Sequence, residues 1–280
     1  MGTMKISSVK VSKLAIYFIS LIWSVVTVYP LFIALISSVK SNEEIFGSMF
    51  SLPRVFYFEF YLEAIETAMM HTAILNSLFL ATTTTFFMII TSSMVSFVLA
   101  RQKYKFLQVI YLLFIVGVML PIHATIIPLA KIVSDINGIN NYFVLTLIYI
   151  AFQLPMSVFL ITGFMKGIPK DLDEAAIIDG CSMFGVLYRI YIPLSAPAIA
   201  TSAILAFLQV YNELLFAVMF LNDRTRHTVS VGLLHFVGHR TVRMGPVFAS
   251  IILAIAPMLI IYIIFNKQIQ KGMLEGAIKG

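Results

Sequence analysis

Long uninterrupted apolar runs constrain the fold more than any other feature of this sequence. Six of them approach the roughly 20 residues that a helix needs to cross a bilayer, and they cover about 14–36, 73–99, 107–130, 143–163, 197–221 and 247–266. Backbone in contact with lipid must satisfy its own hydrogen bonds, and runs of this length can do so only as helices. The alternating pattern of a membrane β-barrel is absent from the sequence. The sequence therefore predicts an all-α polytopic membrane protein with six transmembrane helices.

Charge supports this class and suggests an orientation. Only 11% of the 280 residues are charged, against about 25% in a soluble domain. With six spans, twelve of the 19 Lys and Arg residues fall on the side of the N-terminus. Basic residues mark cytoplasmic loops, so both termini are expected in the cytoplasm, and the net charge of +6 requires no nucleic-acid partner. The single cysteine, Cys181, excludes an internal disulfide.

Two loops on the outer side stand out. The loop 37–72 is rich in glutamate and contains Pro53, and we expect a short amphipathic helix in it, lying on the membrane surface. The loop 222–244 holds four of the seven outer basic residues. That concentration is consistent with a solvated surface loop or with a docking surface for another protein.

The only long cytoplasmic loop, 164–193, contains an acidic, alanine-rich stretch. Asp171 suits the N-terminus of a helix, where unpaired amides favour negative charge, and Ala175 and Ala176 favour helix with little bulk. Gly180 can end the helix in a left-handed conformation, and a second short helix is expected over 182–190. The result is a short exposed helix with a smooth alanine face, which is either a contact surface for a partner or a solvated connector.

A longer pattern separates these two alternatives. The segment Glu174-Ala175-Ala176-Ile177-Ile178-Asp179-Gly180, followed by Ile190-Tyr191-Ile192-Pro193-Leu194, resembles the EAA loop of ABC-importer permeases. Cys181 stands where that family has Ala, and Ile192 where it has Leu. Elsewhere, Tyr211-Asn212-Glu213 looks like the family's aromatic-Asn-acid element. Val231-Gly232-Leu233-Leu234 with Phe236-Val237-Gly238, and the C-terminal tail, resemble the smaller permease of the maltose-type carbohydrate group.

The resemblance implies one permease domain over 1–280 with the type I (MetI-like) fold, in a bacterial cell membrane. The EAA loop would be a coupling helix seated on a cytoplasmic ATPase, and that role falls on Glu174, Ala175, Ala176, Asp179 and Gly180. The implied partners are a second, larger permease, two ATPase subunits, an extracellular or periplasmic solute-binding protein, the sugar and membrane lipid. ATP and Mg would be bound by the ATPases, and no cofactor by this chain.

Residues for solute contact and docking are also implied. Glu213 is the one carboxylate near a span, and intramembrane charge is a functional candidate by default. Together with Asn212 and Gln153 it is assigned to the translocation path, although lone polar residues in helix bundles often serve only as interhelical contacts. The loop 222–244 would reach toward the solute-binding protein through Gly232, His235, Gly238, His239 and Arg240, and its simpler interpretation is an ordinary flexible loop.

Other function classes find less support. The sequence has no Walker A pattern, no HExxH and no Gly-x-Ser-x-Gly, so neither ATP binding nor a catalytic or metal site is expected. A secondary transporter would need coupling carboxylates within its helices, and only Glu213 is available. A structural scaffold leaves the ordered EAA pattern unexplained. An ABC permease for another small polar solute remains the main alternative to a sugar importer.

Overall fold

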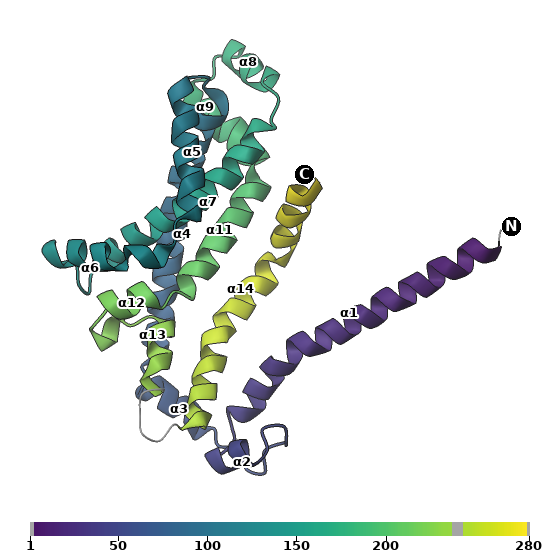
Figure 1. Cartoon of the computed structure of the whole chain (residues 1–280), viewed down its shortest axis with the longest axis vertical. Coiled ribbons are helices and arrows are strands. Elements are labelled where there is room, and N and C mark those ends of the chain that lie inside the picture. The colour runs from purple at the N-terminus through teal and green to yellow at the C-terminus, as the bar shows by residue number, and fades with distance from the viewer. Residues whose placement is uncertain (1–2, 237–242, 279–280) are drawn as a thin grey trace. The chain divides into compact units, whose positions relative to one another are not determined.

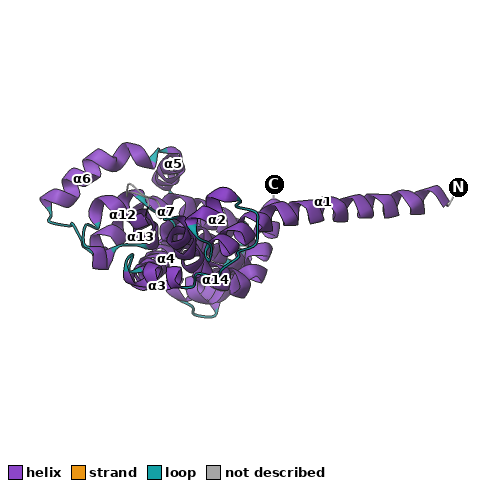
Figure 2. Ribbon diagram, turned by 90° about the horizontal axis from the view of Figure 1, so that it is seen from below, coloured by secondary structure: helices purple, strands orange, loops and turns teal. Residues whose placement is uncertain are grey.

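The computed structural model describes residues 3–236 and 243–278, with the side chains of 3–12, 14, 15 and 267–278 left out. Every regular element in this part of the chain is a helix, and none is a strand (Figure 2). The all-α prediction is confirmed. Packing divides the chain into two compact units, Met1–Met70 with Leu233–Ala256 and His71–Gly232 with Pro257–Gly280. Whether the whole chain acts as one membrane domain stays a prediction.

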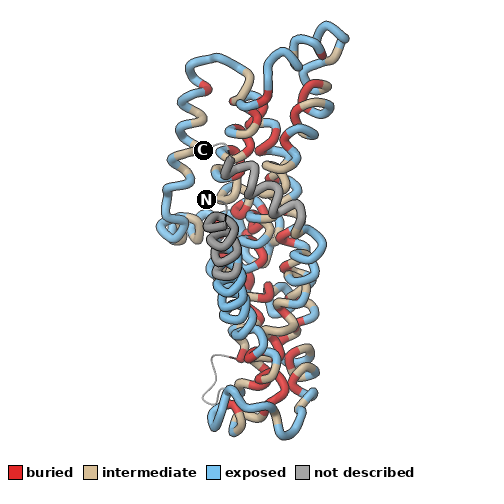
Figure 3. The backbone as a smooth tube through the Cα atoms, turned by 90° about the vertical axis from the view of Figure 1, so that its right-hand side faces the viewer, coloured by how far each residue is buried: buried red, intermediate tan, exposed pale blue. Residues whose placement is uncertain are grey.

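The first unit is built from α1 (Thr3–Ser37), α2 (Asn42–Gly47), α3 (Glu59–Glu66) and the first part of α14 (Met244–Ile278). All residues from Ile16 to Phe32 of α1 are exposed (Figure 3). This stretch is apolar, so its exposure suits a lipid or protein environment rather than water.

The sequence predicts one short helix between residues 37 and 72, and the structure has two there, α2 and α3. Ser41 caps α2 by accepting a hydrogen bond from the Glu44 amide at 3.3 Å. The loop is further held by Lys40, whose fully buried ammonium group donates to the Met49 carbonyl at 3.1 Å. A buried amine that finds carbonyl acceptors fixes the backbone around it.

The second unit contains α4 (Met70–Arg101) and α7 (Tyr142–Lys166), with α5 (Lys105–Met119) and α11 (Ala196–Tyr211). α7 packs against both α5 and α11 (Figure 1). The shorter elements are η1 (Ile122–Thr125), α6 (Ile126–Asp135), α8 (Asp171–Ile178), α9 (Met183–Val186), the π-helical turn η2 (Leu187–Tyr191), α10 (Ile192–Leu194), α12 (Leu215–Phe220), η3 (Arg224–Arg226), α13 (Val229–Leu233) and η4 (Leu234–Phe236). α8 and α9 lie at one end of this unit, away from α6 and α12 (Figure 1).

Four of the six expected spans are single helices long and apolar enough to cross a membrane, namely Ile16–Ser37, Met70–Arg101, Tyr142–Lys166 and Met244–Asn266. The other two expected spans overlap bent helix pairs, Lys105–Met119 with Ile122–Asp135 and Met183–Leu194 with Ala196–Tyr211. The described residues therefore hold four helices of this kind, or six candidate spans if each pair is one span.

The expected continuous helix over 107–130 is wrong in its middle. α5 ends at Met119, and the segments Lys105–Met119 and Ile122–Asp135 meet at 96°. Pro121 explains the break, because its ring disfavours helical geometry at the preceding residue and it has no amide hydrogen to donate. Leu120 is accordingly extended, with ψ of 129°.

The expected helix over 197–221 is also interrupted. α11 ends at Tyr211, and α12 begins only at Leu215. At its other end, α11 turns by 76° from the preceding segment Met183–Leu194. The candidate sites described next lie at these interruptions.

Candidate translocation pocket, coupling segment and outer loop

A cavity of about 480 Å³ lies where the helices of the second unit are interrupted. Its walls come from α7, the end of α11, the start of α12 and η1. The polar side chains lining it are His123, Tyr149, Gln153, Gln209, Asn212 and Glu213. The three residues assigned to the path from sequence, Gln153, Asn212 and Glu213, therefore meet at one cavity. Their role in transport stays a prediction.

Glu213 organises one wall of this cavity. Its Oε1 accepts from the Phe216 amide at 2.9 Å, and its Oε2 from the Ala217 amide at 3.1 Å. The Tyr149 hydroxyl also donates to Oε2, at 2.6 Å. The carboxylate thus satisfies amides at the N-terminus of α12, where negative charge is favoured. Glu213 is the residue that starts a new helix after α11.

The cavity combines amide groups with aromatic rings. The rings of Phe152 and Phe216 are stacked, with centroids 5.1 Å apart and planes 24° from parallel. Asn212 donates to the Leu208 carbonyl at 2.9 Å, which orients its side chain. Pockets of mainly apolar walls with a few placed polar groups suit small ligands. No group of three or more His, Cys, Asp or Glu that could hold a metal occurs among the residues described.

The predicted coupling segment, residues 164–193, forms the helix expected from its sequence. α8 runs from Asp171 to Ile178, and Gly180 follows with φ of +81°. The Cys181 amide then donates to the Ala176 carbonyl at 2.9 Å, which closes the helix end. The left-handed ending by Gly180 is confirmed. The second short helix is also present, as α9, and continues into the π-helical turn η2.

The prediction that both alanines of α8 form an exposed face is wrong for Ala176. Ala176 is only 8% exposed and packs within this chain's own cluster, with Met165 and Val186. Ala175 is exposed, as are Glu174, Asp179 and Gly180. Helical periodicity explains the difference, since neighbouring residues of a helix point about 100° apart and cannot share one face.

The sequence analysis did not identify the exposed apolar residues of α8. Ile178 is 84% exposed and Ile177 is 53% exposed. Isoleucines so exposed on a loop helix, beside acidic groups, are unusual for a solvated connector and typical of a protein contact. Their place inside the EAA pattern was the signal available in the sequence.

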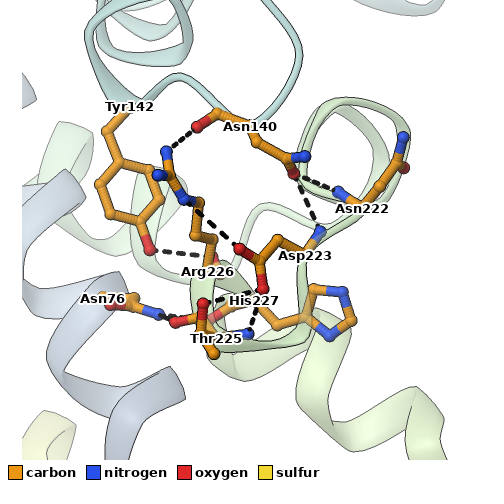
Figure 4. A network of polar contacts seen from close by, with 8 residues as sticks. All are labelled: Asn76, Asn140, Tyr142, Asn222, Asp223, Thr225, Arg226 and His227. Atoms are coloured by element: carbon orange, nitrogen blue, oxygen red, sulfur yellow. Dashed lines mark hydrogen bonds and ion pairs between the residues drawn. The ribbon is translucent and has the colours of Figure 1, made fainter.

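A polar network holds the first part of the loop that follows α12 (Figure 4). Asn140, left-handed with φ of +58°, accepts at its Oδ1 from the amides of Asn222 at 2.6 Å and Asp223 at 2.9 Å. Its carbonyl accepts from the guanidinium of Arg226. One side chain between α6 and α7 thus fixes a loop about 80 residues later in the chain.

Two further side chains hold the same loop. Asn76 of α4 donates to the carbonyls of Thr225 at 2.9 Å and His227 at 3.0 Å. The Tyr142 hydroxyl donates to the Arg226 carbonyl at 3.0 Å. Hydrogen bonds from the Thr225 hydroxyl and amide lower the pKa of Asp223, so this carboxylate stays charged. Burial, and then the nearby Arg224, lower the pKa of His227, which favours its neutral form.

The predicted docking residues lie in different environments. Gly232 is buried inside α13 rather than standing in an exposed loop. His235 lies half-buried in η4 with its ring edge-on to Phe236. Gly238, His239 and Arg240 lie outside the described residues. Among the described residues of the loop 222–244, Asn222–Arg226 form a continuous exposed stretch.

The fold defines a polytopic helical membrane protein, and comparisons with known proteins identify its family. The sequence profile of the family described as "Binding-protein-dependent transport system inner membrane component" matches residues 92–275. The trehalose/maltose transport system permease of Thermococcus litoralis is 30% identical over 268 residues, covering 93% of this chain and 95% of that one. The melibiose/raffinose/stachyose import permease of Bacillus subtilis is 30% identical over 252 residues, covering 90% and 91%.

A solved structure shares the fold. A chain of a bacterial ABC transporter involved in the import of the acidic polysaccharide alginate superposes with a TM-score of 0.80 at 20% identity, covering 93% of this chain and 97% of that one. The present chain belongs to the family of inner membrane components of binding-protein-dependent transport systems. It is a multi-pass membrane permease, a component of a transport system rather than a member of a catalytic enzyme family.

Proposed function

We propose that this chain is the transmembrane permease subunit of an ATP-driven importer of oligosaccharides and forms half of the translocation path. The observation that carries the sugar assignment is the cavity between α7 and α11. Stacked Phe152 and Phe216 offer ring faces for the apolar side of a sugar, and Gln153, Gln209 and Asn212 offer amides for its hydroxyls. Relatives that import different sugars support the same substrate class.

The connections of the pocket helices support coupling to an external motor. α7 runs from the cavity to Lys166, five residues before Asp171, where α8 begins. α11 runs back to the cavity from Ala196, directly after α10. Both walls therefore lead to the coupling segment, so displacement of α8 can move them as rigid bodies, in the manner of alternating access. A pair of ATPases, binding ATP and Mg, would grip α8 through Glu174, Ala175 and Asp179 together with Ile177 and Ile178.

The remaining parts follow from this arrangement. A second, larger permease supplies the other half of the path. The solute-binding protein docks on the outer side, where the ordered loop Asn222–Arg226 offers a preformed surface. Both termini lie in the cytoplasm, on the same side as α8.

Uptake measurements test the pocket. In vesicles carrying the complete transporter, ATP-dependent uptake of labelled oligosaccharide is expected, and Gln153→Ala should raise its KM about tenfold, the scale of one or two hydrogen bonds lost. Gln108→Ala removes an exposed glutamine of α5 that does not line the cavity, and should leave the KM unchanged. Equal effects of both variants would exclude a solute contact at Gln153.

The same vesicles separate the alternatives. Uptake that proceeds without ATP or ATPase subunits would identify a secondary transporter. ATP-dependent uptake of a different small polar solute, with none of any oligosaccharide, would retain the permease and reject the sugar assignment.

A further inference from the structure

One carboxylate ties the coupling helix to two other elements of its unit. Asp173, in the first turn of α8, lies 2.7 Å from Nε of Arg101 at the end of α4. Its Oδ1 accepts from another nitrogen of that guanidinium at 2.7 Å and from the Tyr191 hydroxyl at 2.7 Å. Tyr191 ends the π-helical turn η2 that leads into α10 and α11. We call Asp173, Arg101 and Tyr191 the Asp173 link.

The link is set in a packed environment. The Arg101 side chain is 5% exposed and that of Asp173 is 20% exposed, while Tyr191 is fully buried. The guanidinium lies over the Tyr191 ring, 4.6 Å from its centroid, and Phe97 packs edge-on against the same ring at 5.0 Å. Arg101 also donates to the carbonyls of the turn before α8, those of Ile168 and Pro169.

These contacts resist separation. A guanidinium this deeply buried is unfavourable without its carboxylate, so pulling α8 away from α4 would leave a charge uncompensated. The bonds in the link are charge-assisted and directional, unlike the apolar contacts around them. Apolar side chains can slide past one another, whereas the link allows one register of α8 against α4 and η2.

The link faces inward and leaves the outer surface of α8 unoccupied. Asp173 points to this chain's own elements, while Glu174, Ala175 and Ile178 are exposed. One side of this helix turn is therefore available to an ATPase, and the other side contacts the membrane helices. The neighbouring Asp171 is exposed and takes no part in the link.

We propose that Asp173, Arg101 and Tyr191 are positioning residues that convert displacement of α8 into movement of α4 and α11. The inference rests on the proposed coupling function of α8. The carboxylate transmits force in both directions. It pulls the end of α4 through Arg101, and through Tyr191 it pulls the turn that leads to the pocket wall formed by α11. Without the link, α8 can still contact the ATPase, but its displacement no longer moves α4 and α11.

The ratio of solute moved to ATP hydrolysed measures this role. In vesicles carrying the complete transporter, Asp173→Asn should retain ATP hydrolysis within about twofold while uptake falls at least about tenfold, since the charge-assisted bonds are lost and α8 stays available. Tyr191→Phe removes only one hydroxyl and keeps the ring under Arg101, so it should lower the same ratio by a smaller factor. Asp171→Asn, a carboxylate in the same helix turn outside the link, should leave the ratio unchanged.

Each outcome decides the proposal. An unchanged ratio in Asp173→Asn and Tyr191→Phe overturns the link while wild-type coupled uptake keeps the importer function. If Asp173→Asn does not assemble, Tyr191→Phe decides alone, because its packing is preserved. Recovery of the ratio when Arg101→Asp is combined with Asp173→Arg would support the link directly. Absence of ATP-dependent uptake in the wild type would instead overturn the proposed function itself.

Discussion

Asn140 organises a surface loop through a single amide side chain. It adopts a left-handed backbone conformation, which asparagine tolerates better than most residues. That conformation aims its carbonyl oxygen at two consecutive amides, those of Asn222 and Asp223. Similarly, Glu213 satisfies two amides of α12 with one carboxylate. In both cases one side chain fixes the local path of the backbone. Amides just inside or just beyond the end of a helix lack a partner within the helix and need another acceptor.

Replacement of Asn140 tests this role. Asn140→Gly keeps the backbone conformation and removes the acceptor, so hydrogen exchange at the amides of Asn222 and Asp223 should become about tenfold faster. Asn140→Ala loses the same bonds and adds about 1 kcal/mol of left-handed strain, so exchange should be faster still. Exchange mass spectrometry of peptides covering 220–228 measures both.

A neighbouring asparagine provides the control. Asn137 is also left-handed, with φ of +52°, and its side chain is exposed. Asn137→Gly should leave the protection of 220–228 unchanged. Wild-type protection in Asn140→Gly would mean that the loop is held by Asn76 and Tyr142 instead.

At the scale of elements, the proposed functional sites lie where helices are interrupted. The cavity forms where α11 stops at Tyr211 and where α5 stops before Pro121. The coupling segment consists of four short elements between α7 and α11, one of them a π-helical turn. Continuous helices would have filled both places with regular packing. Broken helices expose unpaired backbone and side chains in the interior, which is where transporters place their sites.

We expect the end of α8 to be sensitive to substitution. Gly180 has φ of +81°, which costs a residue with a β-carbon about 1–2 kcal/mol. Gly180→Leu should therefore abolish uptake, because it strains the helix end and adds bulk to the surface facing the ATPase. Glu174→Lys should abolish uptake as well, by reversing charge on that surface. Uptake assays in cells, with immunoblots of the membrane fraction, measure transport and insertion separately.

A milder substitution at Gly180 separates strain from bulk. Asparagine adopts the left-handed conformation readily, and no atom outside the adjacent residues lies within 4 Å of the position a β-carbon would take. Gly180→Asn should retain most of the transport. Normal uptake in both Gly180→Leu and Glu174→Lys would contradict the coupling role of α8.

At the scale of the whole molecule, the orientation in the membrane decides which site meets which partner. α8 must reach the cytoplasm to meet an ATPase, and the loop Asn222–Arg226 must face outward to meet a solute-binding protein. Twelve of the 19 basic residues favour this arrangement, although the basic outer loop opposes it. The network around Asn140 explains part of that exception, because Arg226 is used within the loop.

Cysteine labelling tests the orientation. In a Cys181→Ser background, which lacks other cysteines, Thr225→Cys should react with a membrane-impermeant maleimide on intact cells. Lys170→Cys, exposed beside α8, should react only after the cells are permeabilised. Reaction of Lys170→Cys on intact cells would show that the proposed orientation is inverted.

The sequence alone determined the helical class, the family pattern and both ends of α8. These features are local: a lipid-facing backbone must bond to itself, and Asp171 and Gly180 act on the helix turn in which they stand. The same reasoning identified Gln153, Asn212 and Glu213, because polar residues in apolar runs are conspicuous.

Only the tertiary structure decided what those residues contact. It placed Ala176 inward, made Glu213 a helix cap, buried Gly232, and joined Asp173 to Arg101 across 72 residues of chain. It also bent the expected span 107–130 near Pro121 and ended the expected helix 197–221 at Tyr211. Such features depend on which distant residues come together, and a residue's local sequence carries no record of its neighbours in space.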